Sequence, residues 1–466
     1  MLKNVNKFFP IATAIFVLIA IFLVSKGLHQ VAIVLYFIFS SILYFIDERY
    51  IISFFVFNLP LLPVVLTDYK ILSFVGPHEI IYGFSYFVLA RFLKKEKGNK
   101  RLNKYQKLSI SFVYFLFFFD LYPLVKDIQL GIHYDSTKGL FYIFKNFVRF
   151  YLYYMSLVFL IKIIYQKDLF RYIIVGVEFA IITIVISMIY TRDLILMDAG
   201  VSYDIGRKAI ILSGEYQRYV GFYGAGGDEN SVGIFMASTF GFFLALFEKN
   251  GNIKKYMVLL GFTVFGVLLT GSRTAFMALA TVVLVFLITN KSGKNKFAIL
   301  MAIVFFYFAF SKQLDAVLQR FLDPSAAKAV NPEDKHGRVG KWIIYLNWLA
   351  SNPQTFMVGN LENINLRRAP HNYFILLAYK TGLIGLFVFL RLLIKLFKSV
   401  KFSLKSTTLK NAYYIIPFPF IIMTVNSFGS SKYLWIFIPL GAYFLSDKER
   451  KKINTKKNKQ HVRHSR

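Results

Sequence analysis

Long apolar segments separated by short polar joints dominate the pattern along the chain. A membrane-crossing helix needs roughly 20 predominantly apolar residues, and about 14 runs approach that length. They lie at residues 8–24, 28–46, 50–66, 71–93, 108–125, 140–161, 171–190, 231–247, 256–270, 274–289, 297–310, 371–390, 412–428 and 433–446. The pattern predicts an all-α integral membrane protein of about 14 transmembrane helices, with one polytopic domain at 1–446 and a basic tail at 447–466.

Composition strengthens this prediction. Hydrophobic residues make up 56% of the chain and aromatic residues 18%, and the mean hydropathy is +0.53, all high for a soluble protein. The first apolar run is long and no small-residue cleavage site follows it, which predicts a retained helix and not a signal peptide. The chain has no cysteine, so disulfides, thiolate ligands and cysteine nucleophiles are excluded.

The distribution of charge predicts which side each joint faces. Basic residues exceed acidic ones by seven to one at 94–107 and by six to none at 391–410, and both joints fall on the same side as the tail. The loops at 191–230 and 311–369 fall on the other side and are nearly balanced. Because Lys and Arg concentrate in cytoplasmic loops, we expect cytoplasmic termini and two extracytoplasmic loops, with only joint 47–49 departing from the bias.

The net charge of +32 also bears on partners. The basic residues lie in short joints between apolar runs, which argues against a nucleic-acid partner. From Arg391 to Lys405 they recur every three or four positions, as on one helical face. Such a face is typical of contact with anionic membrane lipids.

Three positively chargeable residues lie where an apolar run meets an outer loop. Arg218 precedes a glycine-rich segment, Arg273 lies in the tight joint Thr270-Gly271-Ser272-Arg273-Thr274, and His371 opens the run after the large loop. A turn arginine beside the amides of a helix N-terminus can bind phosphate. A histidine at the positive end of a helix dipole has a lowered pKa, which favours the neutral form that acts as a base.

Each of these residues also has a structural interpretation. An arginine at a helix end commonly reaches lipid headgroups, and a histidine after proline can cap a helix. Charges inside the predicted spans are open to two interpretations as well. Lys145 and Arg149 either extend a basic cavity toward a lipid-linked phosphate or neutralise Asp120 and Glu178.

Several common catalytic motifs do not occur in the sequence. It has no Walker A loop, no dinucleotide-binding glycine fingerprint, no HExxH and no Gly-x-Ser-x-Gly elbow. His78-Glu79 and His336 have no second ligand at metal spacing, so we predict neither a metal nor a cofactor. Chemistry on the outer side would then need a substrate already activated in the membrane.

The order of three short motifs resembles the O-antigen ligase and Wzy-type polysaccharide polymerase family. These motifs are the segment from Arg218 to Asn230, the turn at 270–274, and Ala369-Pro370-His371-Asn372-Tyr373 closing a large outer loop. Within the loop and after it, Arg338 to Trp342, Asn352-Pro353, Gly359 and Gly382 to Gly385 extend the resemblance. It covers about residues 200–445.

The resemblance implies a bacterial GT-C-like, metal-independent glycosyltransferase of the cytoplasmic (inner) membrane with an extracytoplasmic active site. It acts on undecaprenyl-diphosphate-linked oligosaccharide repeat units in O-antigen, capsule or exopolysaccharide synthesis, beside a chain-length regulator and a flippase. By the same resemblance, Arg218 and Arg273 bind the diphosphate and His371 is the catalytic base, with Asn230, Arg338 and Asn372 as supporting residues. Gly226 to Asn230 stands where many members have Pro-Asn, so the resemblance supports the role of Asn230 less strongly than the roles of the two arginines.

Three functions remain open from the sequence. The first is a polymerase that joins lipid-linked repeat units. The second is a ligase that transfers finished glycan to lipid A or protein. The third is a flippase or transporter of lipid-linked oligosaccharide, although such proteins often have two similar halves and this sequence has none.

Overall fold

A computed structural model describes most of the apolar runs and little of the outer loops. The described residues are 9–25, 28–60, 77–95, 102, 104–129, 137–163, 167–190, 229–250, 253–309, 311, 314–315, 338–351, 353–360, 372–399, 413 and 416–417. The helices are α1 (Phe9–Ser25), α2 (His29–Ile46), α3 (Glu48–Asn58), α4 (Pro77–Lys95), α5 (Lys104–Gln129), α6 (Thr137–Ile163), α7 (Lys167–Tyr190), α9 (Glu229–Asn250), α10 (Ile253–Thr270), α11 (Arg273–Thr289), α12 (Gly293–Ala309), α15 (Arg338–Ser351), α16 (Pro353–Val358) and α17 (Tyr373–Ser399). No strand occurs among the described residues, which confirms the prediction of helical secondary structure for this part of the chain.

Short polar joints start the helices by capping them. The Asp47 carboxylate accepts a hydrogen bond from the Arg49 amide at 2.9 Å, at the start of α3. Ser292 accepts one from the Asn295 amide at 3.3 Å before α12. Such caps satisfy backbone amides that have no partner within the helix, so the joints set where each apolar run becomes helical.

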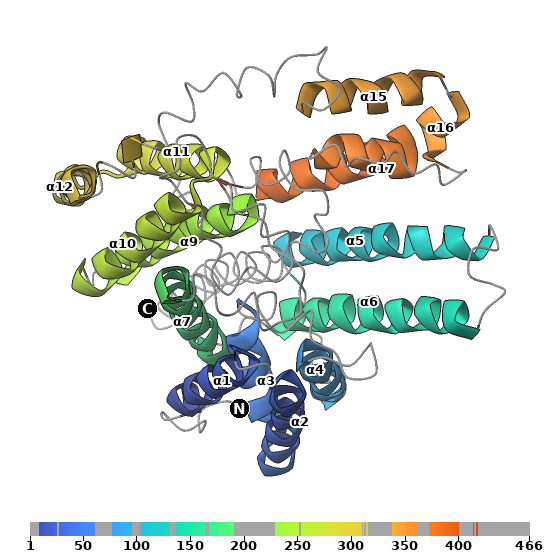
Figure 1. Ribbon diagram of the computed structural model, residues 1–466, viewed down its shortest axis with the longest axis horizontal. Coiled ribbons are helices and arrows are strands. Elements are labelled where there is room, and N and C mark those ends of the chain that lie inside the picture. Colours follow the sequence, from blue (N-terminus) through green and yellow to red (C-terminus); the bar gives the residue numbers. More distant parts are fainter. Residues whose placement is uncertain are drawn as a thin grey trace, which may run out of the picture.

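The helices pack in three neighbouring groups (Figure 1). Helices α1 to α4 pack together, and α7 contacts both α3 and α10. Helices α9, α10 and α11 form a second group that leads into α12. In the third, α6 packs on α5, α5 on α17, and α17 on α15 and α16. The predicted site residues are divided between two groups. The turn at 270–274 lies in the second group, and α17, the helix that follows the large outer loop, lies in the third.

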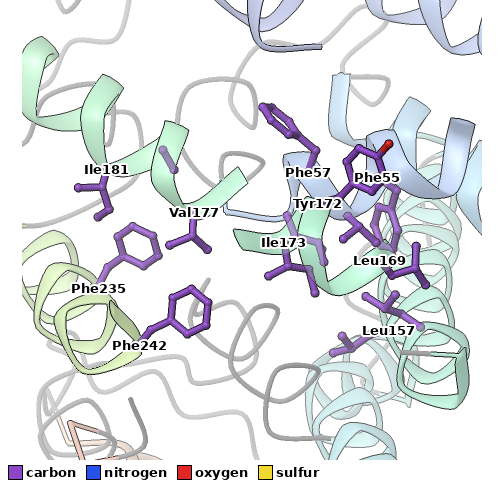
Figure 2. Close-up of a cluster of buried hydrophobic side chains, with 14 of the residues drawn as sticks. Phe55, Phe57, Leu157, Leu169, Tyr172, Ile173, Val177, Ile181, Phe235 and Phe242 are labelled. Atoms are coloured by element: carbon purple, nitrogen blue, oxygen red, sulfur yellow. The ribbon is translucent and has the colours of Figure 1, made fainter. Parts of the chain in front are cut away.

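The core is aromatic and aliphatic, and it joins the groups through α7. Figure 2 shows Val177 and Ile181 of α7 lying toward Phe235 and Phe242 of α9. Phe57 of α3 is fully buried on the other side of α7. Burial of side chains from α3, α6, α7 and α9 in one cluster holds the first and second groups together.

Two described helical stretches are long and apolar enough to cross a membrane, Ile143–Ile163 in α6 and Tyr373–Lys395 in α17. Helices also lie at the ten other predicted runs between residues 8 and 310. The runs at 412–428 and 433–446 fall outside the described residues, apart from Tyr413, Ile416 and Pro417. The number of spans therefore stays a prediction.

Joint 47–49, which departed from the charge bias, lies beside a basic joint. The Lys95 ammonium is 2.6 Å from a Glu48 carboxylate oxygen, and the Arg91 guanidinium is 3.7 Å from the other oxygen. A hydrogen bond from the Arg49 side chain holds the pKa of Asp47 below its ordinary value. Asp47 and Glu48 are thus both paired with cations. Joint 47–49 lies at the same end of the helices as Lys95, which belongs to the basic joint 94–107.

Candidate functional site

The turn between α10 and α11 places Arg273 at a helix N-terminus. Gly271 adopts φ 55°, and its amide donates to the Leu268 carbonyl at 3.0 Å. The buried Ser272 caps α11 by accepting a hydrogen bond from the Ala275 amide at 3.3 Å. Arg273 is therefore the first residue of α11 and half-buried, and its backbone lies at the positive end of the helix dipole.

The start of α9 packs directly on this turn. A Cβ atom at Gly233 would lie 2.6 Å from the Ala275 Cβ and 2.7 Å from the Thr270 hydroxyl oxygen, so only glycine allows this approach. Asn230 is one helical turn earlier in α9, on the same helical face. The N-termini of α9 and α11 thus meet at one end of the bundle together with Arg273, an arrangement that favours an anionic ligand such as a phosphate.

The start of α17 is fixed by Asn372. Its buried side-chain oxygen accepts hydrogen bonds from the amides of Phe374 at 3.0 Å and Ile375 at 3.3 Å. Asn372 is therefore the N-cap of α17, and Tyr373 behind it is fully buried. The structure gives Asn372 a positioning role at the helix end that follows His371, which itself lies outside the described residues.

A buried polar cluster lies behind this helix end; we call it the Asp120 cluster, and it comprises Asp120, Tyr154 and Lys380. The Tyr154 hydroxyl donates to the Asp120 carboxylate at 2.5 Å. Lys380 of α17 interacts with Asp120 through its charge and lies 5.3 Å from the centre of the Phe119 ring. The cluster ties α17 to α5 and α6, and Lys380 lies about two helical turns after Asn372.

The Asp120 cluster yields a stability prediction. Replacing Lys380 by methionine leaves the buried Asp120 carboxylate without its cation, which should destabilise the protein by about 3–5 kcal/mol. We expect the double variant Asp120→Asn, Lys380→Met to recover most of that loss, because no buried charge remains. Unfolding of the detergent-solubilised full chain measures both, with Lys395→Met at an exposed position of the same helix as the control.

A double variant no more stable than Lys380→Met alone would contradict this account of the cluster. Sequence analysis missed Lys380 and Tyr154. A signal was present for Lys380, since it is the only charged residue in the predicted span 371–390. Nothing marked Tyr154 among the 30 tyrosines of the chain.

The other intramembrane charges have partners that the sequence did not indicate. The Arg149 Nε lies 3.5 Å from a Glu79 oxygen and donates to the Tyr153 hydroxyl at 3.0 Å. Glu178 takes Lys255 as its partner at 2.7 Å. Of the two interpretations left open by the sequence, the one in which Arg149 neutralises Asp120 or Glu178 is therefore wrong. Arg149 pairs with Glu79, and the two acids have Lys380 and Lys255 as their cations. Lys145 is half-buried one turn before Arg149 on α6.

The large outer loop contains helices that dock on α17. Arg338 is exposed and begins α15, and Tyr345 and Trp348 of that helix pack edge-on against Tyr379 at 4.8 and 5.0 Å between ring centres. After α16, the Asn360 amide donates to the Tyr379 carbonyl at 2.8 Å, and its side-chain amide donates to the Tyr379 hydroxyl at 2.6 Å. Residues 338–360 thus form a helical unit on α17, although the sequence predicted only a loop there.

Two glycines make this docking possible. Gly359 (φ 93°) and Gly382 (φ 65°) both have left-handed backbone conformations that favour glycine. A Cβ at Gly382 would collide with the Met357 carbonyl, and one at Gly359 with the Lys380 carbonyl. Gly382 also interrupts α17, which bends at the point where the loop unit contacts it.

The structure thus brings together some of the predicted site residues. The backbones of Asn230 and Arg273 lie at the neighbouring N-termini of α9 and α11, and Asn372 lies at the start of α17. Arg218 and His371 fall outside the described residues, so the convergence of Arg218, Arg273 and His371 stays a prediction. Within the described part of the chain, no group of three metal-binding side chains is found.

Comparison with known proteins identifies one family. Residues 257–390 match the family model described as O-antigen ligase. The match runs from α10 through the turn at 270–274 and the helical unit 338–360 to most of α17. It confirms the resemblance over these residues. No curated protein and no solved structure matches the chain.

Proposed function

We propose, on the premise that residues 257–390 resemble O-antigen ligases, that the protein is a polysaccharide polymerase. It joins undecaprenyl-diphosphate-linked repeat units on the outer face of the bacterial cytoplasmic membrane. The observation that carries the proposal is the position of Arg273 in the matched segment, at the N-terminus of α11, on which the start of α9 packs. An arginine fork beside backbone amides suits a diphosphate group.

The proposed reaction is a glycosyl transfer. The hydroxyl oxygen of the acceptor sugar bonds to the anomeric carbon of the donor glycan, while the bond from that carbon to the diphosphate oxygen breaks. His371 accepts the hydroxyl proton, and the diphosphate leaves with the bonding electron pair. Arg273 and Arg218 stabilise the charge that develops on the leaving group.

The proposed location is a multi-pass position with both termini in the cytoplasm. Helix α12 supports it, because large apolar side chains such as Phe297, Phe305 and Phe308 are exposed along its length. Exposed apolar surface of this extent is typical of contact with lipid or a partner. Basic joints at one end of the helices would face the cytoplasm and anionic lipids, and the site would face outward.

Two other functions are compatible with parts of these observations. A ligase that moves finished glycan to lipid A or protein is favoured by the description of the matched family itself. A flippase for lipid-linked oligosaccharide would also use a basic outer site. The three differ in the products that accumulate when the protein is absent.

Deletion of the gene, followed by gel analysis of glycans, tests the proposal. For a polymerase, we expect single-repeat products on the final acceptor and no ladder, with the ladder restored by the full chain. Long glycans that remain on the lipid carrier would instead identify a ligase. Purified protein that moves lipid-linked repeats across liposomes and never lengthens them would identify a transporter.

A further inference from the structure

The helical unit 338–360 exposes apolar side chains beside the face that packs on α17 (Figure 1). Tyr345 and Leu349 of α15 are buried, whereas five large apolar side chains of α15 and α16 are 39–50% exposed. These exposed residues are Ile344, Leu346, Phe356, Met357 and Val358. A helix in contact with water carries mostly charged and polar residues outside its packed stripe, so this surface suits lipid or another protein and not water.

The unit lies along a helix that is long and apolar enough to cross a membrane. The candidate span in α17 starts at Tyr373, and the unit contacts Tyr379, six residues further on. The Met357 carbonyl lies against Gly382, nine residues after Tyr373. At 1.5 Å per helical residue these contacts lie about 9 and 14 Å from the start of the span. Because half of the hydrocarbon core is about 15 Å thick, the unit is level with the part of α17 that crosses one leaflet.

The charge of the unit matches a lipid surface. Residues 338–360 contain two charged residues, Arg338 and Lys341, and both are basic. They lie in the first turn of α15, and Trp342 follows them. Lysine and arginine attract anionic headgroups, and tryptophan is enriched where a membrane meets water. A basic helix start followed by apolar residues is typical of a helix that lies in the membrane interface.

The backbone of the unit also suits apolar surroundings. Helices α15 and α16 satisfy most of their backbone groups internally. The non-helical Gly359 and Asn360 that follow are buried, and the Asn360 amide donates to the Tyr379 carbonyl at 2.8 Å. Non-helical backbone at membrane depth occurs only where protein buries it or where it lines a water-filled cavity. The end of the unit meets the first of these conditions.

We propose that α15 and α16 lie in the membrane, in the leaflet that the N-terminus of α17 reaches, with Arg338 and Lys341 at anionic lipid headgroups. Leu346, Phe356 and the other exposed apolar side chains then contact acyl chains, although sequence analysis predicted an extracytoplasmic loop at residues 311–369. A protein partner would account for the apolar surface but not for its position along a membrane span. The inference goes beyond the proposed function, because it does not depend on the reaction.

Thiol reactivity measures whether this surface is in water. The chain has no cysteine, so Leu346→Cys and Phe356→Cys each give the full chain a single thiol, at an exposed position that leaves the core unchanged. A water-soluble maleimide reacts with the thiolate, and apolar surroundings raise the pKa of a thiol. In nanodiscs we expect both variants to react at least about tenfold more slowly than Lys291→Cys, since one unit of pKa is a factor of about ten in thiolate.

Lys291 is a suitable reference because it is exposed in the joint between α11 and α12. If Leu346→Cys and Phe356→Cys react as fast as Lys291→Cys, water covers the surface and the proposal is overturned.

Quenching by brominated lipid distinguishes lipid from protein as the cover. In a Trp435→Phe background the two remaining tryptophans, Trp342 and Trp348, both lie on α15. Their fluorescence should be lower in nanodiscs whose phosphatidylcholine is brominated on its acyl chains than in unbrominated lipid. Slow thiol reaction without quenching would show that a second copy, or another segment of this chain, covers the surface, and would overturn the proposal.

The two basic residues predict a preference for anionic lipid. One lysine or arginine near an anionic surface contributes a factor of about five (~1 kcal/mol). We therefore expect equal quenching from about fivefold less brominated phosphatidylglycerol than brominated phosphatidylcholine, and loss of this preference in the double variant Arg338→Gln, Lys341→Gln. The matched control is Lys291→Gln, Lys294→Gln at exposed positions of another joint, which should keep the preference within about twofold. Equal quenching by the two lipids in the background protein would overturn the proposal, as would a preference that survives in the Arg338, Lys341 variant.

Both readouts are independent of glycan transfer. If gene deletion rejects a polymerase, thiol reactivity and quenching still decide whether α15 and α16 lie in the membrane. If these two measurements fail, the assignment of the reaction is not affected.

Discussion

Arg273→Ala is expected to lower the rate of glycan transfer by about 10²–10³-fold, the usual cost of removing one charge-stabilising group from an active site. Arg273 begins α11 at the turn on which α9 packs, so its loss would leave these helix termini without the group that we propose contacts the leaving diphosphate. The measurement is initial polymer formation from purified lipid-linked repeats. Arg273→Lys should restore only part of the rate, because a lysine keeps the charge but not the bidentate fork.

The control for Arg273 is a basic residue at the opposite end of the same helix. Lys291 lies just beyond the C-terminus of α11 and is exposed. Lys291→Ala removes the same charge and should leave the rate within about twofold, as expected for a surface cation far from the chemistry. Equal losses in the two variants would show that net charge matters and would remove Arg273 from the site.

His371→Ala is expected to reduce transfer by about 10²–10⁴-fold, the typical contribution of a general base. In the sequence the residue immediately precedes Asn372, the cap of α17. His371→Gln should not rescue the rate, since an amide cannot accept the proton, although it can hydrogen-bond. His336→Ala in the same outer loop is the matched control.

A pH profile adds a readout that misfolding cannot mimic. In the unaltered protein, the rate should fall as pH drops and the imidazole becomes protonated, because only the neutral form accepts a proton. The residual activity of His371→Ala should lose this dependence. Long-chain polymer of near-normal length from His371→Ala would rule out the assigned base.

The apolar runs predicted the helices well because each is specified locally. Unbroken apolar sequence with polar caps is sufficient to place α11 between Ser272 and Asn290. The position of Arg273 at a tight turn was also readable, since the two apolar runs are only a few residues apart. Local sequence was therefore sufficient to predict the helix boundaries and the position of one candidate site residue, Arg273.

Contacts between distant segments were not readable from the sequence. The packing of Gly233 on the 270–274 turn joins residues about 40 positions apart, and the pairing of Lys380 with Asp120 joins residues 260 apart. In a single sequence, nothing about one residue of such a contact indicates which distant residue is its partner. The helical unit 338–360 was missed because α15 is too short to be recognised as a membrane span and polar residues surround it on both sides in the sequence.

The bend at Gly382 has a consequence for how the outer loop can vary. In an unbroken helix the Tyr379 carbonyl would accept the amide four residues later, but at the bend the Asn360 amide donates to it. The segment 353–360 thus supplies the backbone donor that α17 itself lacks at the bend. A single residue added between Pro353 and Asn360 should therefore displace the Asn360 amide and leave the Tyr379 carbonyl without its donor in apolar surroundings.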